Sequence, residues 1–184
     1  VGSEMCIRDR VEIDEMVVQV SQEFFPTLSV GFDDNRTNLY YENGTRFVKN
    51  HPNSYDVILV DSTDPVGPAV ALFEESFFRS VSESLRSNGV LTMQSESPFF
   101  DGDLVRSVIR RLRRIFPHVR LYLAPIVTYP GGHWSFSFAG KGFGPLDGPY
   151  AKRFSERRLR TRYYTPDIHN AALQLPQYIK DLLK

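Results

Sequence analysis

The sequence is poor in cysteine and histidine, the residues that most often build disulfides and transition-metal sites. Its single cysteine, Cys6, excludes a disulfide within these 184 residues and fits a reducing, cytoplasmic compartment. The four histidines are scattered along the chain and show no spacing typical of a metal site. We therefore expect neither a disulfide framework nor a bound metal.

An excess of one charge and long apolar runs are also missing. The 22 basic residues balance the 22 acidic ones, so nothing in the overall charge predicts nucleic acid as a partner. No apolar run is long enough to cross a bilayer and no secretory signal is visible, so we expect no membrane association. The hydrophobic share of 41% is ordinary for a soluble globular domain.

The first ten residues, "VGSEMCIRDR", differ from the rest of the chain. They show no hydrophobic period and resemble the non-native read-through found at the ends of some gene models. We therefore set residues 1–10 aside and base the fold prediction on residues 11–184.

From residue 11 onward, strand patterns alternate with helical patterns. The clearest strand is "YDVILVD", whose run from Val57 to Val60 is apolar without alternation, as in a parallel strand covered on both faces. A helix is predicted over 74–89, ended by Gly89, and an amphipathic one over 102–116. The alternation predicts an α/β fold with a doubly wound, mostly parallel sheet.

Polar side chains follow the ends of four predicted strands. Glu12 follows the first, Asn43 the second and Asp61 the third, while Gln94 and Glu96 end the fourth. In doubly wound sheets ligands bind beyond the carboxyl ends of the strands. A row of acids and amides along this edge therefore indicates a ligand site.

The stretch "DSTDPVGPA", residues 61–69, places Asp61 and Asp64 three residues apart. Taken alone, the two residues could be simple turn formers. Here an apolar strand delivers Asp61 to the ligand edge. The pair suits a substrate with ammonium groups, because one carboxylate can accept a proton while the other keeps its charge.

Three other stretches each allow two interpretations. Glu12 either binds ribose hydroxyls or is a surface carboxylate. Asn43 either faces an adenine amino group or forms an Asn-Gly turn with positive φ. In "TYPGGHW", Tyr129 could wall a slot for a polymethylene chain, whereas a tight turn with Trp134 in the core is at least as expected.

The five arginines of "RSVIRRLRRIF" are expected on a solvated helix face rather than on nucleic acid.

Several stretches together resemble one family. They are "VEIDEMVVQVSQEFFP", "YDVILVDSTDPVGPAVALF", "MQSESP", "TYPGGHWSFSFAGKG" and "RYYTPDIHNAALQLPQYI". In this order they resemble the polyamine aminopropyltransferases, spermidine synthase above all, over nearly everything from Val11 to the end.

The resemblance implies a Rossmann-like fold of the S-adenosylmethionine methyltransferase type. It implies transfer of an aminopropyl group from decarboxylated S-adenosylmethionine to a diamine, usually putrescine, with no metal or redox cofactor. Asp61 would be the general base. The amine site would further comprise Ser62, Thr63, Asp64, Gln94 and Tyr129.

For the nucleoside, the resemblance implies that Glu12 binds the ribose, that Asn43 and Gly44 meet adenine, and that Pro68 lines the pocket. The family usually has Asp-Gly where this chain has Asn43-Gly44, so the charge at this point is lost. The family's glycine-rich loop, a central strand and a β-rich segment are expected upstream of Val11. Residues 11–184 would then be a partial catalytic domain, truncated at the N-terminus, of a homodimer or homotetramer.

Two alternatives stay open. A methyltransferase that uses S-adenosylmethionine would share Glu12 and the strand layout, but it leaves Asp61 and Asp64 beside Tyr129 unexplained. A non-catalytic protein that binds polyamines or nucleosides is the second alternative, and the neutral Asn43 is compatible with it.

Overall fold

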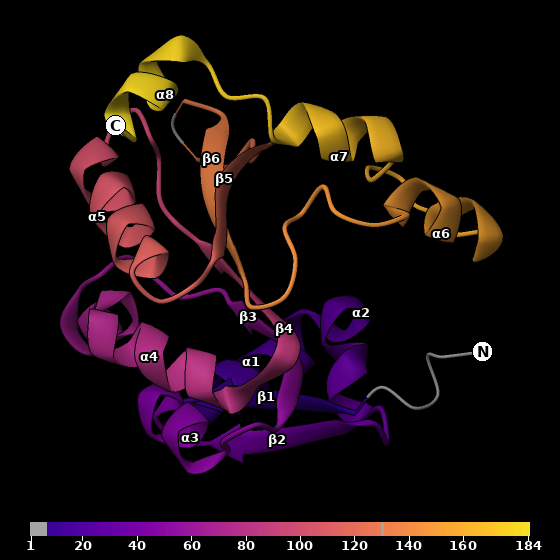
Figure 1. Ribbon diagram of the computed structural model, residues 1–184. Helices are drawn as coiled ribbons and strands as arrows, with labels where there is room; N and C mark the ends of the chain where they lie inside the picture. The colour runs from indigo at the N-terminus through magenta and orange to yellow at the C-terminus, as the bar shows by residue number, and fades with distance from the viewer. Residues whose placement is uncertain (1–6, 130) are drawn as a thin grey trace. The chain divides into compact units, whose positions relative to one another are not determined.

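The computed structural model describes residues 7–129 and 131–184 (Figure 1). The chain divides into two compact units, Val1–His51 and Pro52–Lys184. Cys6 and the rest of residues 1–6 lie outside the described residues, as does Pro130. The predictions made on Cys6 and on the start of the chain therefore stay predictions.

The first unit is a parallel strand pair with its connecting helices. Its elements are β1 (Arg8–Glu12), α1 (Glu15–Phe24), α2 (Pro26–Ser29), the 3₁₀ helix η1 (Val30–Asp33), β2 (Thr37–Tyr41) and α3 (Gly44–Asn50). Strand β1 begins at Arg8, so three of the residues that the fold prediction left out pair with β2. Asp14 begins α1, because its carboxylate accepts a hydrogen bond from the backbone N–H of Met16 at 2.9 Å.

The second unit contains a mixed four-stranded sheet with the order β3-β4-β6-β5. Strands β3 and β4 are parallel, whereas β6 is antiparallel to both β4 and β5. The elements are β3 (Tyr55–Val60), the 3₁₀ helix η2 (Gly67–Phe73), α4 (Glu75–Ser84), β4 (Leu85–Gln94), α5 (Gly102–Arg113), β5 (His118–Pro125), β6 (His133–Gly140), α6 (Tyr150–Glu156), α7 (Pro166–Ala172) and α8 (Gln177–Leu182).

The predicted single sheet is divided into two. Among the described strands, β1 pairs only with β2, and β3 pairs only with β4. Strands β1 and β3 therefore each have one edge without a ladder partner in the described part of the chain.

Helices α4 and α5 cover one face of the four-stranded sheet, and α6 and α7 lie on the other side (Figure 1). Helix α5 is amphipathic, and its apolar stripe is fully buried at Val105, Val108, Ile109 and Leu112. The predicted helix over 74–89 runs five residues too far at its C-terminal end. It ends at Ser84, because from Leu85 the chain pairs with β3 instead.

The prediction that β3 is covered on both faces is wrong. Val57 is 53% exposed and Leu59 is 71% exposed. On their side of the sheet the helix in contact is α7, and its contacts are with β5 at the far edge. The side chains near β3 on this face are therefore open.

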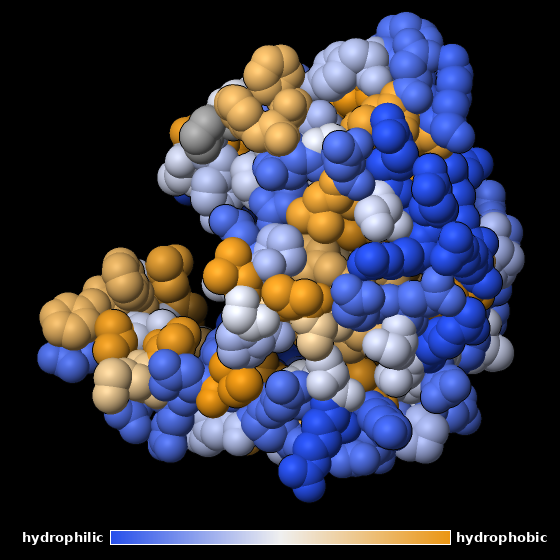
Figure 2. Space-filling model, turned by 90° about the vertical axis from the view of Figure 1, so that its left-hand side faces the viewer, coloured by the Kyte–Doolittle hydropathy of each residue, from blue (hydrophilic) through white to orange (hydrophobic). Residues whose placement is uncertain are grey.

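Arginines on α5 and at its C-cap contact their own chain. Arg106 donates to the carbonyl of Leu182 at 2.7 Å, and Arg114 donates to the Glu75 carboxylate at 3.0 Å. Figure 2, which looks onto the side that carries α4 and α5, shows many hydrophilic residues there. This agrees with a solvated helix face. No described helix is long and apolar enough to cross a membrane.

Candidate active site

The register of the second sheet brings its functional residues to one edge. Val60 pairs with Met93 in the parallel ladder, so Asp61 emerges opposite Gln94, the last residue of β4. Strand β6 runs antiparallel, and Phe136 pairs with Gln94. The hairpin between β5 and β6 therefore lies at the same edge as the loop after β3.

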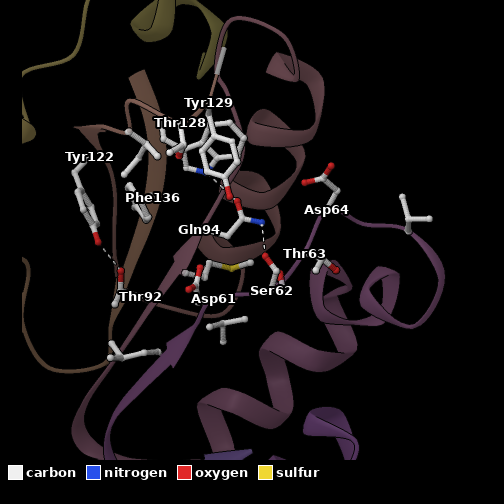
Figure 3. Close-up of a pocket in the computed structure, with 16 residues that line it drawn as sticks. Asp61, Ser62, Thr63, Asp64, Thr92, Gln94, Tyr122, Thr128, Tyr129 and Phe136 are labelled. Carbon is white, nitrogen blue, oxygen red and sulfur yellow. Dashed lines mark hydrogen bonds between the residues drawn. The ribbon is translucent and has the colours of Figure 1, made fainter. Parts of the chain in front are cut away.

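A cavity of about 840 Å³ opens at this edge (Figure 3). Its volume is in the range of small-molecule sites. All six residues predicted for the amine site line it, namely Asp61, Ser62, Thr63, Asp64, Gln94 and Tyr129. The sequence patterns had not placed other lining residues there, among them Thr92, Tyr122, Trp134 and Phe136.

The two carboxylates of the loop are separate anionic points. Both Asp61 and Asp64 are exposed. In Figure 3 they lie on opposite sides of Ser62 rather than in contact. A ligand with two cationic ends could therefore meet one carboxylate at each end, while its apolar middle lies against the cavity wall.

The Gln94 side chain is held by four hydrogen bonds from protein groups. Its Oε1 accepts from the backbone N–H of Glu96 at 3.0 Å and from the Trp134 indole N–H at 3.1 Å. Its Nε2 donates to the Ser62 carbonyl at 3.2 Å and to the Glu96 carboxylate at 2.8 Å. Both groups that meet Oε1 can only donate, so the orientation of the amide is unambiguous.

Glu96 is a buried carboxyl group directly behind this amide, with 3% of the residue exposed. Burial raises its pKa, and the charges of Asp64 and Asp101 raise the pKa further, whereas the hydrogen bond from Gln94 lowers it. Its φ of 67° lies in the left-handed region, which is uncommon for a residue other than glycine. The sequence placed Glu96 in the polar row at the strand ends but indicated no role for it.

Ser62 has two different polar environments. Its carbonyl accepts the hydrogen bond from Gln94. Its Oγ is buried and has no hydrogen-bond partner in the described part of the chain. Buried polar atoms are nearly always paired, so this hydroxyl is an exception among the described residues.

Two aromatic pairs form the apolar walls of the cavity. Tyr129 stacks on Trp134 with ring centroids 4.4 Å apart, and Tyr122 stacks on Phe136 at 5.3 Å. Trp134 is thus not a purely core residue, because its ring lines the cavity and its N–H bonds Gln94. The Tyr122 hydroxyl is 2.9 Å from the Thr92 hydroxyl, and burial raises the pKa of Tyr122.

In the first unit, Glu12 and Asn43 lie at the carboxyl ends of neighbouring parallel strands. Glu12 is the last residue of β1 and pairs with Tyr41, and Asn43 follows Tyr41 by two residues. The Glu12 carboxylate accepts from the backbone N–H of Asp14 at 3.2 Å. The two residues therefore share one edge of this sheet, as the strand patterns predicted.

The turn interpretation of Asn43-Gly44 is wrong. Asn43 has a φ of −70° and begins α3, and its Oδ1 accepts from both the backbone N–H and the hydroxyl of Thr45. Both acceptor positions of that oxygen are therefore used by Thr45.

Pro68 lies in η2 and is not among the residues that line the cavity.

Within residues 7–129 and 131–184, no three His, Cys, Asp or Glu side chains are grouped so that they could hold a metal ion.

The profile of the spermine/spermidine synthase domain matches residues 6–145. The polyamine aminopropyltransferase of Moorella thermoacetica is 45% identical over 174 residues, which cover 95% of this chain and 60% of that protein. The enzyme of the same name from Caldicellulosiruptor saccharolyticus is 43% identical, with 95% and 62% covered. The chain thus spans about 60% of the length of these relatives.

Solved structures agree with the sequence relatives. A spermidine synthase in complex with the transition-state analogue AdoDATO superposes with a TM-score of 0.94 and 32% identity over 98% of this chain and 62% of that one. The spermidine synthase of Thermotoga maritima gives a TM-score of 0.90 at 32% identity, with 97% and 60% covered. The chain therefore belongs to the spermine/spermidine synthase family and has its Rossmann-like α/β fold.

Proposed function

We propose that this protein transfers an aminopropyl group from decarboxylated S-adenosylmethionine to putrescine, which gives spermidine and methylthioadenosine. One observation carries the proposal: Asp61 and Asp64 line the same cavity as the stacked rings of Tyr129 and Trp134. Anionic points beside an apolar wall suit a polymethylene chain with ammonium ends. The names of the relatives support this reaction class.

Asp61 is the general base of the proposed reaction. An ammonium group is no nucleophile, so Asp61 first takes one of its protons. The nitrogen lone pair then forms the bond to the aminopropyl carbon, and the electrons of the carbon–sulfur bond go to the sulfonium sulfur. Sulfur leaves as a neutral thioether, so the proposed chemistry needs neither a metal nor a redox cofactor.

The remaining residues hold and align the two substrates, which is the main work when the leaving group is already activated. Asp64 binds the second ammonium group, Tyr129 and Trp134 pack on the methylene chain, and the Ser62 hydroxyl and Thr63 complete the amine site. Glu12 accepts from the ribose hydroxyls. Asn43, Gly44 and Pro68 form part of the nucleoside site.

Assembly, location and the activity of the 184 residues by themselves stay predictions. We expect a homodimer or homotetramer in the cytoplasm. We expect the chain by itself to have little activity, because β1 and β3 each have an edge without a partner among the described strands. Joining it to the part of the Moorella enzyme that it does not cover should raise the turnover.

An assay of the products tests the proposal. The protein and this chimera are incubated with labelled decarboxylated S-adenosylmethionine and, separately, with putrescine, agmatine, cadaverine or spermidine. Methylthioadenosine together with spermidine from putrescine supports the proposal. Formation of S-adenosylhomocysteine from S-adenosylmethionine would favour a methyltransferase, and saturable amine binding without product from either protein would favour a non-catalytic binding protein.

A further inference from the structure

We propose that Gln94 is a positioning residue that fixes the loop carrying Asp61 and Asp64, and that Trp134 and Glu96 hold its amide in place for this purpose. The inference rests on the proposed function, because it names how the base and the amine-binding carboxylate are kept in register. It also changes the role of Gln94, which the family resemblance assigned to contact with the amine.

The first argument is that the Gln94 amide has no hydrogen-bonding capacity left for a substrate. An amide oxygen has two lone pairs, and both are met, by the N–H groups of Glu96 and Trp134. The amide nitrogen has two hydrogens, and both are directed to protein oxygens, on Ser62 and Glu96. An amine could thus touch Gln94 only by displacing one of these bonds.

The second argument is where the bond to Ser62 acts. Ser62 follows Asp61 directly and comes two residues before Asp64. A hydrogen bond to the Ser62 carbonyl therefore restrains the backbone that carries both carboxylates. Gln94 is the end of β4, and it is 6% exposed. The bond therefore ties the loop to the rigid end of a sheet strand, and a shift of about 1 Å in such a loop can cost about 10²-fold in rate.

The third argument is the backbone of Glu96. A left-handed conformation costs of order 1–3 kcal/mol outside glycine. At Glu96 it lets the backbone N–H reach Oε1 of Gln94 while the carboxylate of the same residue reaches Nε2. The Glu96 carbonyl is fixed in turn by the backbone N–H of Ser135 at 3.1 Å and by its hydroxyl at 2.7 Å. One buried residue thus holds both ends of the amide.

The fourth argument is the connection to the hairpin. Trp134 donates to Gln94 and stacks on Tyr129, which also lines the cavity. The Asp61–Asp64 loop, the end of β4 and the β5–β6 hairpin are therefore joined through one amide. A substitution of Trp134 should therefore alter the positions of Asp61 and Asp64 through its effect on Gln94.

Steady-state kinetics of three variants test the proposal on the protein or on the chimera with the Moorella segment. Gln94→Met keeps the length of the side chain but removes all four bonds, and Trp134→Phe keeps a ring on Tyr129 but removes one donor. We expect kcat to fall about 10- to 100-fold in Gln94→Met. In Trp134→Phe we expect a fall of about 2- to 10-fold, the worth of one hydrogen bond. The amine KM should change less than about twofold in Gln94→Met, because this variant removes no proposed substrate contact.

The double variant decides whether Trp134 acts through Gln94. If it does, Gln94→Met/Trp134→Phe has the kcat of Gln94→Met alone, whereas independent roles give multiplied losses. Tyr150→Phe is the matched control, because it removes the ring hydroxyl that donates to Asn170 far from the cavity and keeps the ring stacked on His169. A raised amine KM with unchanged kcat in Gln94→Met, multiplied losses, or a Trp134→Phe variant as active as the control would overturn the proposal.

A measurement without substrate separates this inference from the proposed function. Trp134 is the only tryptophan, so its indole N–H gives one resonance in a ¹⁵N-labelled sample. We expect its hydrogen exchange to be at least about 10-fold faster in Gln94→Met than in the unchanged protein. Equal exchange would overturn the proposed bonding. If the unchanged protein forms no methylthioadenosine but exchange is faster in Gln94→Met, the proposed function is wrong and the proposed hydrogen bonds around Gln94 are supported.

Discussion

The two faces of the four-stranded sheet differ in both cover and chemistry. On the covered face, Leu91, Leu121 and Ala139 are at most 3% exposed under α4 and α5. On the open face, one residue further along the same strands, Thr92 and Tyr122 line the cavity. Because neighbouring residues of a strand point to opposite faces, one apolar strand can supply the core and the site at once.

The difference shows where the stability of this unit comes from. The covered face holds the fully buried aliphatic and aromatic side chains, whereas the open face holds hydroxyls, an amide and half-buried rings. Burial of apolar area dominates the folding free energy. Substitutions on the two faces should therefore separate into losses of stability and losses of activity.

The largest effect on stability is expected from a matched pair of leucines. Leu91→Ala removes a side chain with no exposure and should lower the free energy of unfolding by about 2–5 kcal/mol. Leu59→Ala, on the neighbouring strand but 71% exposed, should cost less than about 1 kcal/mol. Urea unfolding followed by circular dichroism measures both. Equal losses would mean that the open face is covered in solution.

On the open face the next effect should appear in substrate binding. Asp64→Asn should raise the amine KM about 10- to 100-fold, the worth of a hydrogen bond between charged groups, with a smaller change in kcat. Asp56→Asn is the control, because Asp56 is an exposed acid at the opposite end of β3 that pairs with Arg86. If both variants keep the KM of the unchanged protein, the amine does not meet Asp64.

A smaller effect is expected from a polar pair within the covered face. Ser95 and Ser137 are fully buried, and their hydroxyls lie 2.6 Å apart. Ser137→Ala should lower the free energy of unfolding by about 1–3 kcal/mol, because the hydroxyl of Ser95 loses its best partner in the interior. The kcat of the folded variant should change little. A loss of kcat without a loss of stability would contradict the separation of stability and activity between the two faces.

The smallest effect is a change of stability with pH that comes from Glu96. Its pKa is raised in the folded state, above the ordinary value of 4.5. A raised pKa means that the stability it contributes is fully present below about pH 4.5 and is lost as the pH rises through the folded pKa. Glu96→Gln keeps an acceptor for Gln94 without a charge.

Urea unfolding at several pH values checks this sign. From about pH 4.5 upward, the unchanged protein should lose stability relative to Glu96→Gln. If instead the unchanged protein gains stability relative to the variant as the pH rises, the carboxylate is better stabilised in the folded state than burial allows.

Much of the site could be predicted from the sequence, because an apolar strand and its register decide where the next residue lies. The run from Val57 to Val60 sufficed to place Asp61 at the carboxyl edge, and a second strand placed Gln94 beside it. The same reasoning placed Glu12 and Asn43 at the edge of the first sheet. These predictions depend only on local period and on parallel pairing.

The remainder depends on contacts between distant segments. The bonds around Gln94 need the left-handed backbone of Glu96 and a hairpin about forty residues away, which no local pattern encodes. Helix α4 stops at Ser84, where Leu85 pairs with Tyr55 of the preceding strand. The exposure of Leu59 likewise reflects what covers the sheet, not the composition of β3.

The most direct measurement is the rate of methylthioadenosine formation by Asp61→Asn under saturating substrates, compared with the unchanged protein. Removal of a general base should lower this rate about 10²- to 10⁴-fold. Binding of the nucleoside co-substrate, measured by calorimetry, should stay within about twofold because Asp61 makes no proposed contact with it. An unchanged rate would contradict the assignment of this sheet edge as the place where the amine is deprotonated and attacks.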